Sequence, residues 1–293
     1  MKRSGMVSII GRPNAGKSTL LNALVGEKIA ITAPKPQTTR TRICGVLNLA
    51  DTQIVFVDTP GFHKPRTALG EYMAGVVNAS VGGVDCVLLT VEPEPSVGTQ
   101  EKLLLERVKH LPCVLVINKI DTVKDKKALL EVIGAYQSER EFTAIVPVSA
   151  ERRDGLDILK EILAPLMPEG GPLFPPDMVS DQSDEALVGE IIREKMLRLL
   201  DNEVPHGVAV AVERLNQRDD GLVECDATVL CERESHKGII IGKGGERLGR
   251  IGKSARLDME RMFGEKVALK LWVKVKENWR DNAGVLRNLG YTQ

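Results

Sequence analysis

The chain has 293 residues, enough for two domains with separate cores, and its 43% hydrophobic content is ordinary for a globular protein. Its 40 basic and 40 acidic side chains cancel, which excludes an overall electrostatic argument for a nucleic-acid partner. No apolar run approaches the ~20 residues of a membrane-spanning helix, and residues 1–5 lead directly into the first predicted strand, so we expect neither a membrane helix nor a signal peptide.

The cysteines and histidines do not suggest a metal centre. Five cysteines are scattered without CxxC spacing, mostly within apolar runs, and the four histidines show no regular spacing. We therefore expect buried, reduced thiols in the cytoplasm and no zinc site.

A phosphate-binding loop is predicted near the amino terminus. The apolar run 7–10 leads into a GxxxxGK[ST] segment that opens a helical pattern. Gly11 and Gly16 let backbone N–H groups point at a phosphate, Lys17 is expected to reach the β- and γ-phosphates, and Ser18 to ligate Mg²⁺. The alternative is a structural glycine turn, which the later motifs disfavour. The predicted nucleotide contacts in this loop are Gly11, Arg12, Pro13, Asn14, Ala15, Gly16, Lys17, Ser18 and Thr19.

A second strand, 54–57, ends in an acid and a turn. Asp58 is expected to hold the metal through water, and Gly61 to offer its N–H to a γ-phosphate. A first switch is predicted between Lys28 and Arg42; Thr38 and Thr39 are both candidates for the hydroxyl on Mg²⁺, and we favour Thr39. The predicted nucleotide contacts here are Asp58, Thr59, Pro60, Gly61 and Phe62; the predicted metal ligands are Ser18, Thr39 and Asp58, and the predicted catalytic residues are Lys17, Thr39 and Gly61.

Two further strand ends predict recognition of guanine. The run 114–117 leads into Asn118, Lys119, Ile120 and Asp121, and the run 144–148 leads into Ser149 and Ala150. The Asp121 carboxylate can accept hydrogen bonds from the N1–H and 2-amino group of guanine, and adenine offers no donors there. The backbone of Ser149 and Ala150 can approach the guanine O6. An ATP-dependent kinase or ATPase is therefore disfavoured.

Alternating strand-like and helix-like runs predict a three-layer α/β domain. The runs 42–49 and 53–58 are joined too closely for a parallel crossover and should form an antiparallel hairpin, so the six-stranded sheet is expected to be mixed but mostly parallel. A Pro/Gly-rich stretch from 168 to 184 predicts a linker. The expected organisation is a nucleotide domain over 1–168, a linker over 169–185 and a second domain over 186–293.

The second domain has the order αββααβ, with a GxxG turn between two helices, and resembles a type II KH domain. Residues 236–256 hold six basic side chains and a single acid, which favours RNA over a merely solvated helix face. With almost no aromatics near the turn, bases should be read by backbone hydrogen bonds and apolar contacts; Trp272 is expected in the core, and Trp279 is left open. The predicted RNA contacts are Lys237, Ile240, Ile241, Gly242, Lys243, Gly244, Gly245, Arg247, Arg250 and Lys253.

Taken together, the nucleotide motifs, the run 36–40 in the first switch, the segments 190–195 and 271–276 and the KH-like half resemble the Era family of bacterial GTPases over nearly the whole length. The resemblance implies a P-loop GTPase domain joined to an α+β KH domain, with GTP/GDP and Mg²⁺ as cofactors. It also implies GTP hydrolysis coupled to binding the 3′ end of 16S rRNA during assembly of the 30S ribosomal subunit, by a monomer that is cytoplasmic and partly peripheral on the inner membrane. The alternative is an RNA-binding assembly factor in which nucleotide occupancy, and not turnover, is the signal.

Two positions bear on mechanism. Many GTPases carry a water-orienting glutamine where this chain has Phe62, so we expect slow intrinsic turnover. Asn14, within the phosphate loop, resembles the asparagine of GTPases that bind K⁺ beside the phosphates. The alternative for Asn14 is a side chain that only stabilises the loop.

Overall fold

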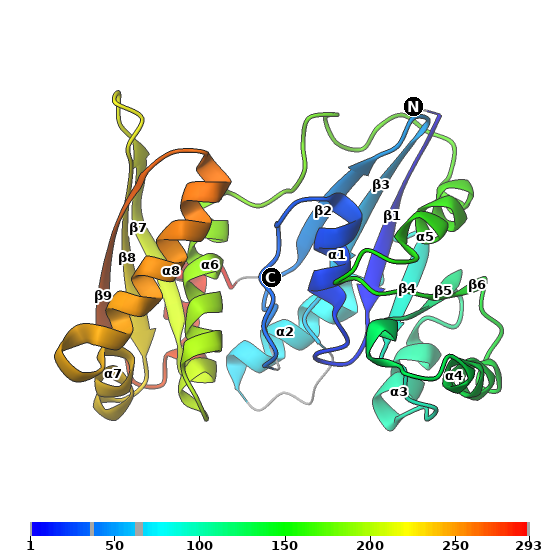
Figure 1. Ribbon diagram of the computed structural model, residues 1–293, viewed down its shortest axis with the longest axis horizontal. Coiled ribbons are helices and arrows are strands. Elements are labelled where there is room, and N and C mark those ends of the chain that lie inside the picture. Colours follow the sequence, from blue (N-terminus) through cyan, green and yellow to red (C-terminus); the bar gives the residue numbers. More distant parts are fainter. Residues whose placement is uncertain (1, 36–37, 62–66, 292–293) are drawn as a thin grey trace. The chain divides into compact units, whose positions relative to one another are not determined.

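The computed structural model describes residues 2–35, 38–61 and 67–291, which divide into two compact units (Figure 1). Unit 1 takes the described residues of Met1–Ala30, Thr39–Lys64 and Met73–Asp181; unit 2 takes those of Ile31–Thr38, Pro65–Tyr72 and Gln182–Gln293. The domain bounds expected from composition, with a linker over 169–185, stay a prediction.

Unit 1 is an α/β domain whose strands alternate with helices along the chain. Its strands are β1 Arg3–Ile10, β2 Ile43–Asn48, β3 Thr52–Asp58, β4 Cys86–Val91, β5 Cys113–Ile117 and β6 Ala144–Pro147. Its helices are α1 Lys17–Val25, α3 Thr99–Arg107, α4 Lys127–Gln137 and α5 Leu156–Leu163, and helix α2, Ala68–Ala79, has residues in both units.

The described strands of unit 1 form one sheet in the order β2-β3-β1-β4-β5-β6. Strands β2 and β3 are antiparallel and every other neighbouring pair is parallel, which confirms the predicted hairpin in a mixed, mostly parallel sheet. Strands β4 and β5 are buried along their whole length, which explains why they are continuous apolar runs.

Helices cover both faces of this sheet (Figure 1). Leu20 and Leu24 of α1 pack with Leu159 of α5 in one cluster, whereas Leu104 of α3 and Val132 of α4 belong to a cluster on the other face. The carboxyl ends of the parallel strands are thereby held at one edge of a rigid three-layer core, where the predicted motifs begin.

The first part of the predicted linker, residues 169–181, packs against the sheet of unit 1. Gln53 is buried; its Oε1 accepts hydrogen bonds from the N–H groups of Leu173 (2.7 Å) and Phe174 (2.9 Å), and its Nε2 donates to Phe174 O (2.9 Å). The N–H of Val46 donates to Val179 O (2.9 Å). Proline and glycine prevent regular structure here, but the segment is fixed by one buried amide and by strand β2.

Unit 2 contains the KH-like half. Its helices are α6 Asp184–Leu199, α7 Glu234–Ile241, α8 Glu246–Phe263 and α9 Ala283–Asn288, and its strands are β7 Ala209–Gln217, β8 Val223–Cys231 and β9 Val267–Val275. Helix α6 begins at Asp184, because the Ser183 side chain accepts a hydrogen bond from the N–H of Ala186 and so caps the helix. The predicted αββααβ order is confirmed, with α9 added after it.

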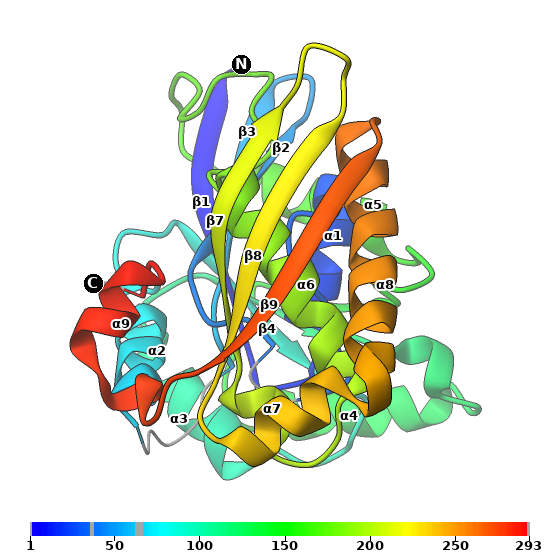
Figure 2. The same cartoon turned by 90° about the vertical axis from the view of Figure 1, so that its left-hand side faces the viewer.

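The three strands form a sheet in the order β7-β8-β9, with β7 and β8 antiparallel and β8 and β9 parallel. Figure 2 shows this sheet in front of α6 and α8. Ile192 of α6 and Ile251 and Met259 of α8 pack on Val229 of β8 in one buried cluster. The opposite face of the sheet carries the remaining side chains of each strand.

Candidate functional site

The phosphate loop lies between β1 and α1, with no room for side chains at its glycines. Gly16 has φ 89°, and a Cβ there would lie 2.3 Å from Asn118 Nδ2; a Cβ on Gly11 would lie 2.3 Å from Thr90 O. Asn14 is exposed with φ 67°, Ala15 is buried, and Thr19 lies in the first turn of α1. The backbone therefore follows the tight curve that a phosphate cradle requires.

Lys17 is buried beneath this loop. Its Nζ donates to Gly11 O (3.1 Å) and Arg12 O (2.9 Å). Burial lowers the pKa of Lys17 to about 8, and the charge of Asp58 opposes that shift. The ammonium is thus held by two neutral carbonyl oxygens, which the charged oxygens of a phosphate can replace.

Three oxygen-bearing side chains meet beside Lys17. Ser18 Oγ donates to Asp58 Oδ2 (2.6 Å) and lies 2.8 Å from Thr39 Oγ1, which is 3.3 Å from the same carboxylate oxygen. Burial raises the pKa of Asp58, while Lys17 and the two hydroxyls lower it. The structure brings together the three residues predicted as metal ligands.

The structure also separates the two threonines of the first switch. Thr39 belongs to unit 1, whereas Thr38 belongs to unit 2, where its Oγ1 donates to Lys35 O (2.7 Å) and its carbonyl accepts from Arg193. Only Thr39 reaches the oxygen cluster. Residues 36 and 37 of this switch lie outside the described residues.

The loop after β3 lies against the phosphate loop. A Cβ on Gly61 would lie 2.9 Å from Pro13 Cα, so any side chain there would collide with the phosphate loop. Thr59 is buried and donates from Oγ1 to Ile9 O (3.1 Å), a bond to β1. Pro60 is buried next to it, and Phe62 lies outside the described residues.

Asn118 has a role that its sequence motif does not reveal. Its Nδ2 donates to Ala15 O (3.0 Å), and its Oδ1 accepts from the N–H of Ala150 (3.0 Å). Asn118 thereby ties the phosphate loop to the turn after β6. The backbone of Ser149 and Ala150 was expected to approach the guanine O6, and the Ala150 N–H of that segment is engaged by the Asn118 side chain.

Asp121 is half-buried, and Ser149 Oγ donates to its Oδ1 (2.6 Å). This hydrogen bond lowers the pKa of Asp121 and keeps the carboxylate ionised. Lys119 has φ 62° and pairs through Nζ with Glu92 Oε1 (2.5 Å), and Ile120 begins a 3₁₀ turn. Sequence reasoning missed the roles of the Ser149 hydroxyl and of Glu92. Glu92 directly follows β4, and Ser149 lies two residues after the end of β6. Their positions at strand ends are the signal that could have identified them.

The GxxG turn of unit 2 joins α7 to α8. Gly242, Gly244 and Gly245 have φ of 74°, 61° and 84°, and a Cβ on Gly244 or Gly245 would meet nothing within 4 Å. Backbone conformation, and not crowding, demands glycine at those two positions. Arg247 Nη1 donates to Ile239 O (2.6 Å) across the turn, so this predicted RNA contact also braces the turn.

Two expectations about this unit are wrong, those for the side chain of Ile240 and for Trp272, and the open case of Trp279 is answered. Ile240 is 0% exposed in the core and cannot contact RNA through its side chain; Ile239, 41% exposed, lies at the surface instead, and Ile241 is half-buried. Trp272 is 43% exposed, because it lies on the outer face of β9. Trp279 is the buried tryptophan, and its Nε1 donates to Gly207 O (2.9 Å).

The predicted basic contacts of unit 2 differ in exposure. Lys243, Arg250 and Lys253 are exposed, whereas Lys237 is half-buried. The exposed cations flank the glycine turn and follow the first half of α8, so they lie where an RNA backbone at the turn would pass.

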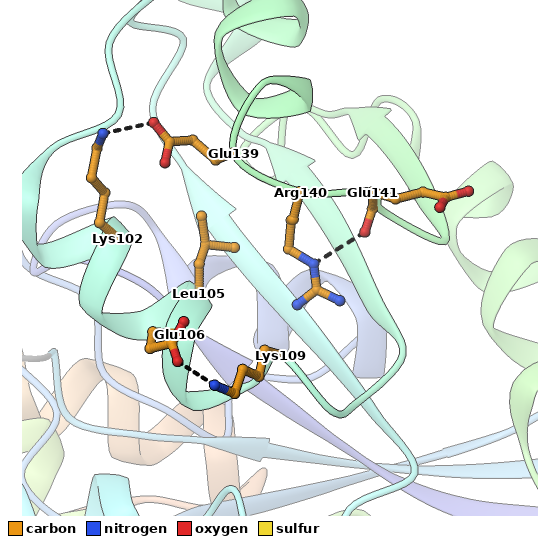
Figure 3. A pocket seen from close by; sticks show the side chains of 7 residues that line it. All are labelled: Lys102, Leu105, Glu106, Lys109, Glu139, Arg140 and Glu141. Atoms are coloured by element: carbon orange, nitrogen blue, oxygen red, sulfur yellow. Dashed lines mark hydrogen bonds and ion pairs between the residues drawn. The ribbon is translucent and has the colours of Figure 1, made fainter.

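A polar pocket of about 460 Å³ in unit 1 shares no residue with the predicted sites (Figure 3). It lies between α3 and the turn after α4, where Lys102 pairs with Glu139 (2.7 Å) and Arg140 Nε donates to Glu141 O (3.1 Å). These satisfied charges explain the pocket structurally.

In the described residues, no helix is both long and apolar enough to cross a membrane.

The fold and site define a P-loop GTPase joined to a KH domain. The family described as 50S ribosome-binding GTPase matches residues 6–119, and the KH domain family matches residues 203–280. GTPase Era of Caldanaerobacter subterraneus subsp. tengcongensis is 49% identical over 292 residues, covering 99% of this chain and 98% of that protein. GTPase Era of Clostridium tetani is 47% identical, and both chains are covered completely.

Two solved structures are similar over the whole length. One is Era in complex with MgGDPNP and nucleotides 1506–1542 of 16S ribosomal RNA, with a TM-score of 0.95, 38% identity and 100% of each chain covered. The other is an Aquifex aeolicus Era variant bound to GDP·AlF4⁻, also with a TM-score of 0.95 and 38% identity, covering 99% of this chain and 100% of that chain. This chain belongs to the Era family of GTPases, and it hydrolyses GTP.

Proposed function

We propose that this chain is a cytoplasmic switch protein that couples GTP hydrolysis to binding of single-stranded RNA at the 3′ end of 16S rRNA, and so assists assembly of the 30S subunit. The observation that carries the nucleotide half is the meeting of Ser18, Thr39 and Asp58 beside Lys17. The RNA half is supported by the glycine turn at the start of the basic helix α8 and by the 16S rRNA fragment named for the similar Era structure.

The oxygen cluster fits Mg²⁺. Hydroxyl and carboxylate oxygens are the ligands this hard cation prefers, and Mg²⁺ keeps several waters, so Ser18 and Thr39 would ligate it directly and Asp58 through water. When bound with GTP, the ion would neutralise charge on the β- and γ-phosphate oxygens.

The residues of the chain prepare the phosphates for attack. Lys17 breaks its hydrogen bonds to the carbonyls of Gly11 and Arg12 and binds phosphate oxygens instead. The N–H groups of the loop lie at the start of α1, so the positive end of the helix dipole also attracts the phosphates. Gly61, pressed against Pro13, can present its N–H to the γ-phosphate. With Phe62 where a glutamine would orient water, we infer slow turnover without a partner.

We infer that Asp121 reads guanine. Ser149 holds its carboxylate ionised as an acceptor, and Asn118 fixes the two loops that border the base. A carboxylate faced with adenine would lose its hydrogen bonds, which disfavours ATP.

Asn14 supports a proposed K⁺ site. It occupies an exposed, left-handed position in the phosphate loop, where its amide oxygen can face a nucleotide. A cation there would stabilise charge that develops between the phosphates. The monomeric state and a peripheral association with the inner membrane rest on the family resemblance alone and stay proposals.

Crosslinking of the purified protein to small-subunit RNA, with GTP, with GDP and without nucleotide, tests the coupling. We expect crosslinks at 16S nucleotides near the 3′ end whose yield depends on the nucleotide. Equal yields in all three states would contradict a switch. Thr39→Ala, which should slow hydrolysis, separates the alternative: if cells that carry it mature 30S subunits at the normal rate, occupancy and not turnover is the signal.

A further inference from the structure

Arg12 of the phosphate loop is tied to a buried acid on helix α3. Its Nε forms an ion pair with Glu101 Oε1, and the Glu101 side chain is only 1% exposed. Among the residues that the structure describes, Arg12 is the only basic side chain paired with Glu101. Removal of one partner would leave the buried carboxylate without its counter-charge, which is strongly unfavourable, so the pair ties the Arg12 side chain to α3.

The carboxylate of Glu101 has a prepared position. Gly98 precedes α3, and a Cβ there would lie 2.6 Å from Glu101 Oε2, so glycine leaves the space that the carboxylate occupies at the start of the helix. Leu104 and Leu105 anchor α3 in the core. Tyr136 of α4 borders the pair: burial raises the pKa of this phenol, Glu101 raises it further, and Arg12 lowers it.

The same arginine is linked to Lys17 through its backbone. Arg12 O accepts a hydrogen bond from Lys17 Nζ (2.9 Å), alongside Gly11 O (3.1 Å). Lys17 must leave both carbonyls to reach a phosphate. While it moves, the peptide at Arg12 would be free to turn unless its side chain were held.

We propose that Glu101 is a positioning residue of the nucleotide site: through its ion pair with Arg12 it holds the first half of the phosphate loop on α3 when Lys17 moves to the phosphates. This inference rests on the proposed nucleotide site. It predicts that loss of the pair loosens the loop and speeds nucleotide release, because fewer loop N–H groups stay aimed at the phosphates.

The experiment compares Glu101→Gln, Arg12→Gln and the double variant in the full chain. GDP dissociation is followed by chase of a fluorescent GDP, and single-turnover hydrolysis is measured at saturating GTP. Each single variant should release GDP about tenfold faster, and Glu101→Gln should keep hydrolysis within about threefold of the unsubstituted protein, because saturating GTP offsets the weaker binding. The double variant should match the singles, since the two residues act as one pair.

Two further variants keep the test decisive. Glu94→Gln removes a second acid that pairs with Arg12. The Glu94 side chain is 60% exposed, and its Oε2 lies 3.6 Å from Arg12 Nη2. Because this is a surface ion pair, GDP release should change less than about twofold. Gly98→Ala displaces the Glu101 carboxylate without removing a charge and should speed release, so the test survives poor folding of the Glu101 variant.

Unchanged GDP release in Glu101→Gln and Gly98→Ala, or effects of the two single variants that multiply in the double variant, would overturn the positioning role. Failure of the nucleotide site itself looks different. In that case the unsubstituted protein would not retain GDP, or Lys17→Gln would retain it equally well.

Discussion

The Ser149 hydroxyl donates a 2.6 Å hydrogen bond to the Asp121 carboxylate, so the residue that we assign to guanine recognition is oriented by the turn after β6. Ser149, after β6, thus orients the carboxylate of Asp121, after β5, and lowers its pKa. This relationship makes base recognition testable at two positions with different expected outcomes.

Asp121→Asn should transfer the preference from GTP to xanthosine triphosphate, because the new amide matches the carbonyl at C2 of xanthine. GTP affinity should fall about a hundredfold or more. Titration of nucleotide-stripped protein with both nucleotides measures the change. Ser149→Ala is the matched control: it removes one hydrogen bond but keeps the carboxylate, so GTP should stay preferred. Unchanged GTP affinity in Asp121→Asn would refute the assignment.

Thr39→Ala and Thr38→Ala form a second matched pair, because only Thr39 reaches Ser18 and Asp58. Loss of this hydroxyl should lower single-turnover hydrolysis by about tenfold or more and raise the Mg²⁺ concentration needed for half the maximal rate. Thr38→Ala, which loses bonds to Lys35 O and Ala33 O but none to the oxygen cluster, should stay within about twofold. Equal losses in both variants would remove Thr39 from the metal site.

The lowered pKa of Lys17, about 8, predicts a pH dependence of GDP binding. Bound phosphates raise this pKa, so binding favours the protonated lysine. Affinity should therefore be greatest below pH 8 and decline as the pH rises through 8, by at most about tenfold per pH unit. Calorimetry at pH 8.5 in two buffers of different ionisation heat should detect proton uptake. Lys17→Gln should abolish that uptake; uptake that persists in it would assign the proton to another group.

The double substitution Lys243→Asp with Gly244→Asp should abolish RNA affinity, because it places two negative charges at the turn where the RNA backbone passes. Lys270→Asp, an exposed charge reversal on β9, is the control and should bind RNA nearly normally. Retained GDP affinity verifies folding. If about four phosphates are neutralised, the log–log salt slope of the unsubstituted protein is near −3. Full RNA affinity in the double variant would place the RNA elsewhere.

Replacing K⁺ by Na⁺ at constant ionic strength tests the proposed role of Asn14. Single-turnover hydrolysis should be faster in K⁺, by about tenfold, if a cation stabilises charge between the phosphates. Asn14→Ala should remove the difference between the two salts. The same rate in K⁺ and Na⁺ for the unsubstituted protein would leave Asn14 as a loop-stabilising residue.

Much of unit 1 could be predicted because its chemistry follows buried strands. Asp58, Asn118 and Ser149 each come directly after an apolar run, and parallel strands bring such ends to one edge. What a side chain does there depends on neighbours distant in sequence. The contacts of Asn118 with Ala15 and Ala150 could not be read from its motif, nor could the pair of Arg12 with Glu101.

In unit 2 the errors have local causes. Helix α7 is only eight residues long, so its periodicity could not show that Ile240 faces the core while Ile239 faces outward. Trp272 alternates with Lys270 and Lys274 along β9, which places it on the same outer face as the lysines. That alternation is visible in the sequence, but the expectation for Trp272 rested on the usual preference of tryptophan for burial, and so it was wrong.

The buried amide of Gln53 and the segment 169–181 decide where a stand-alone GTPase fragment should stop. A protein truncated at Pro168, where composition changes, would leave that amide with Asn48 Oδ1 (2.9 Å) in place of its bonds to Leu173 and Phe174. It would also uncover the side chains of Cys44 and Val57, which Phe174 covers. Such a fragment would self-associate during purification. One that extends to Asp181 keeps its flank closed, so it is the appropriate fragment for enzymology without RNA.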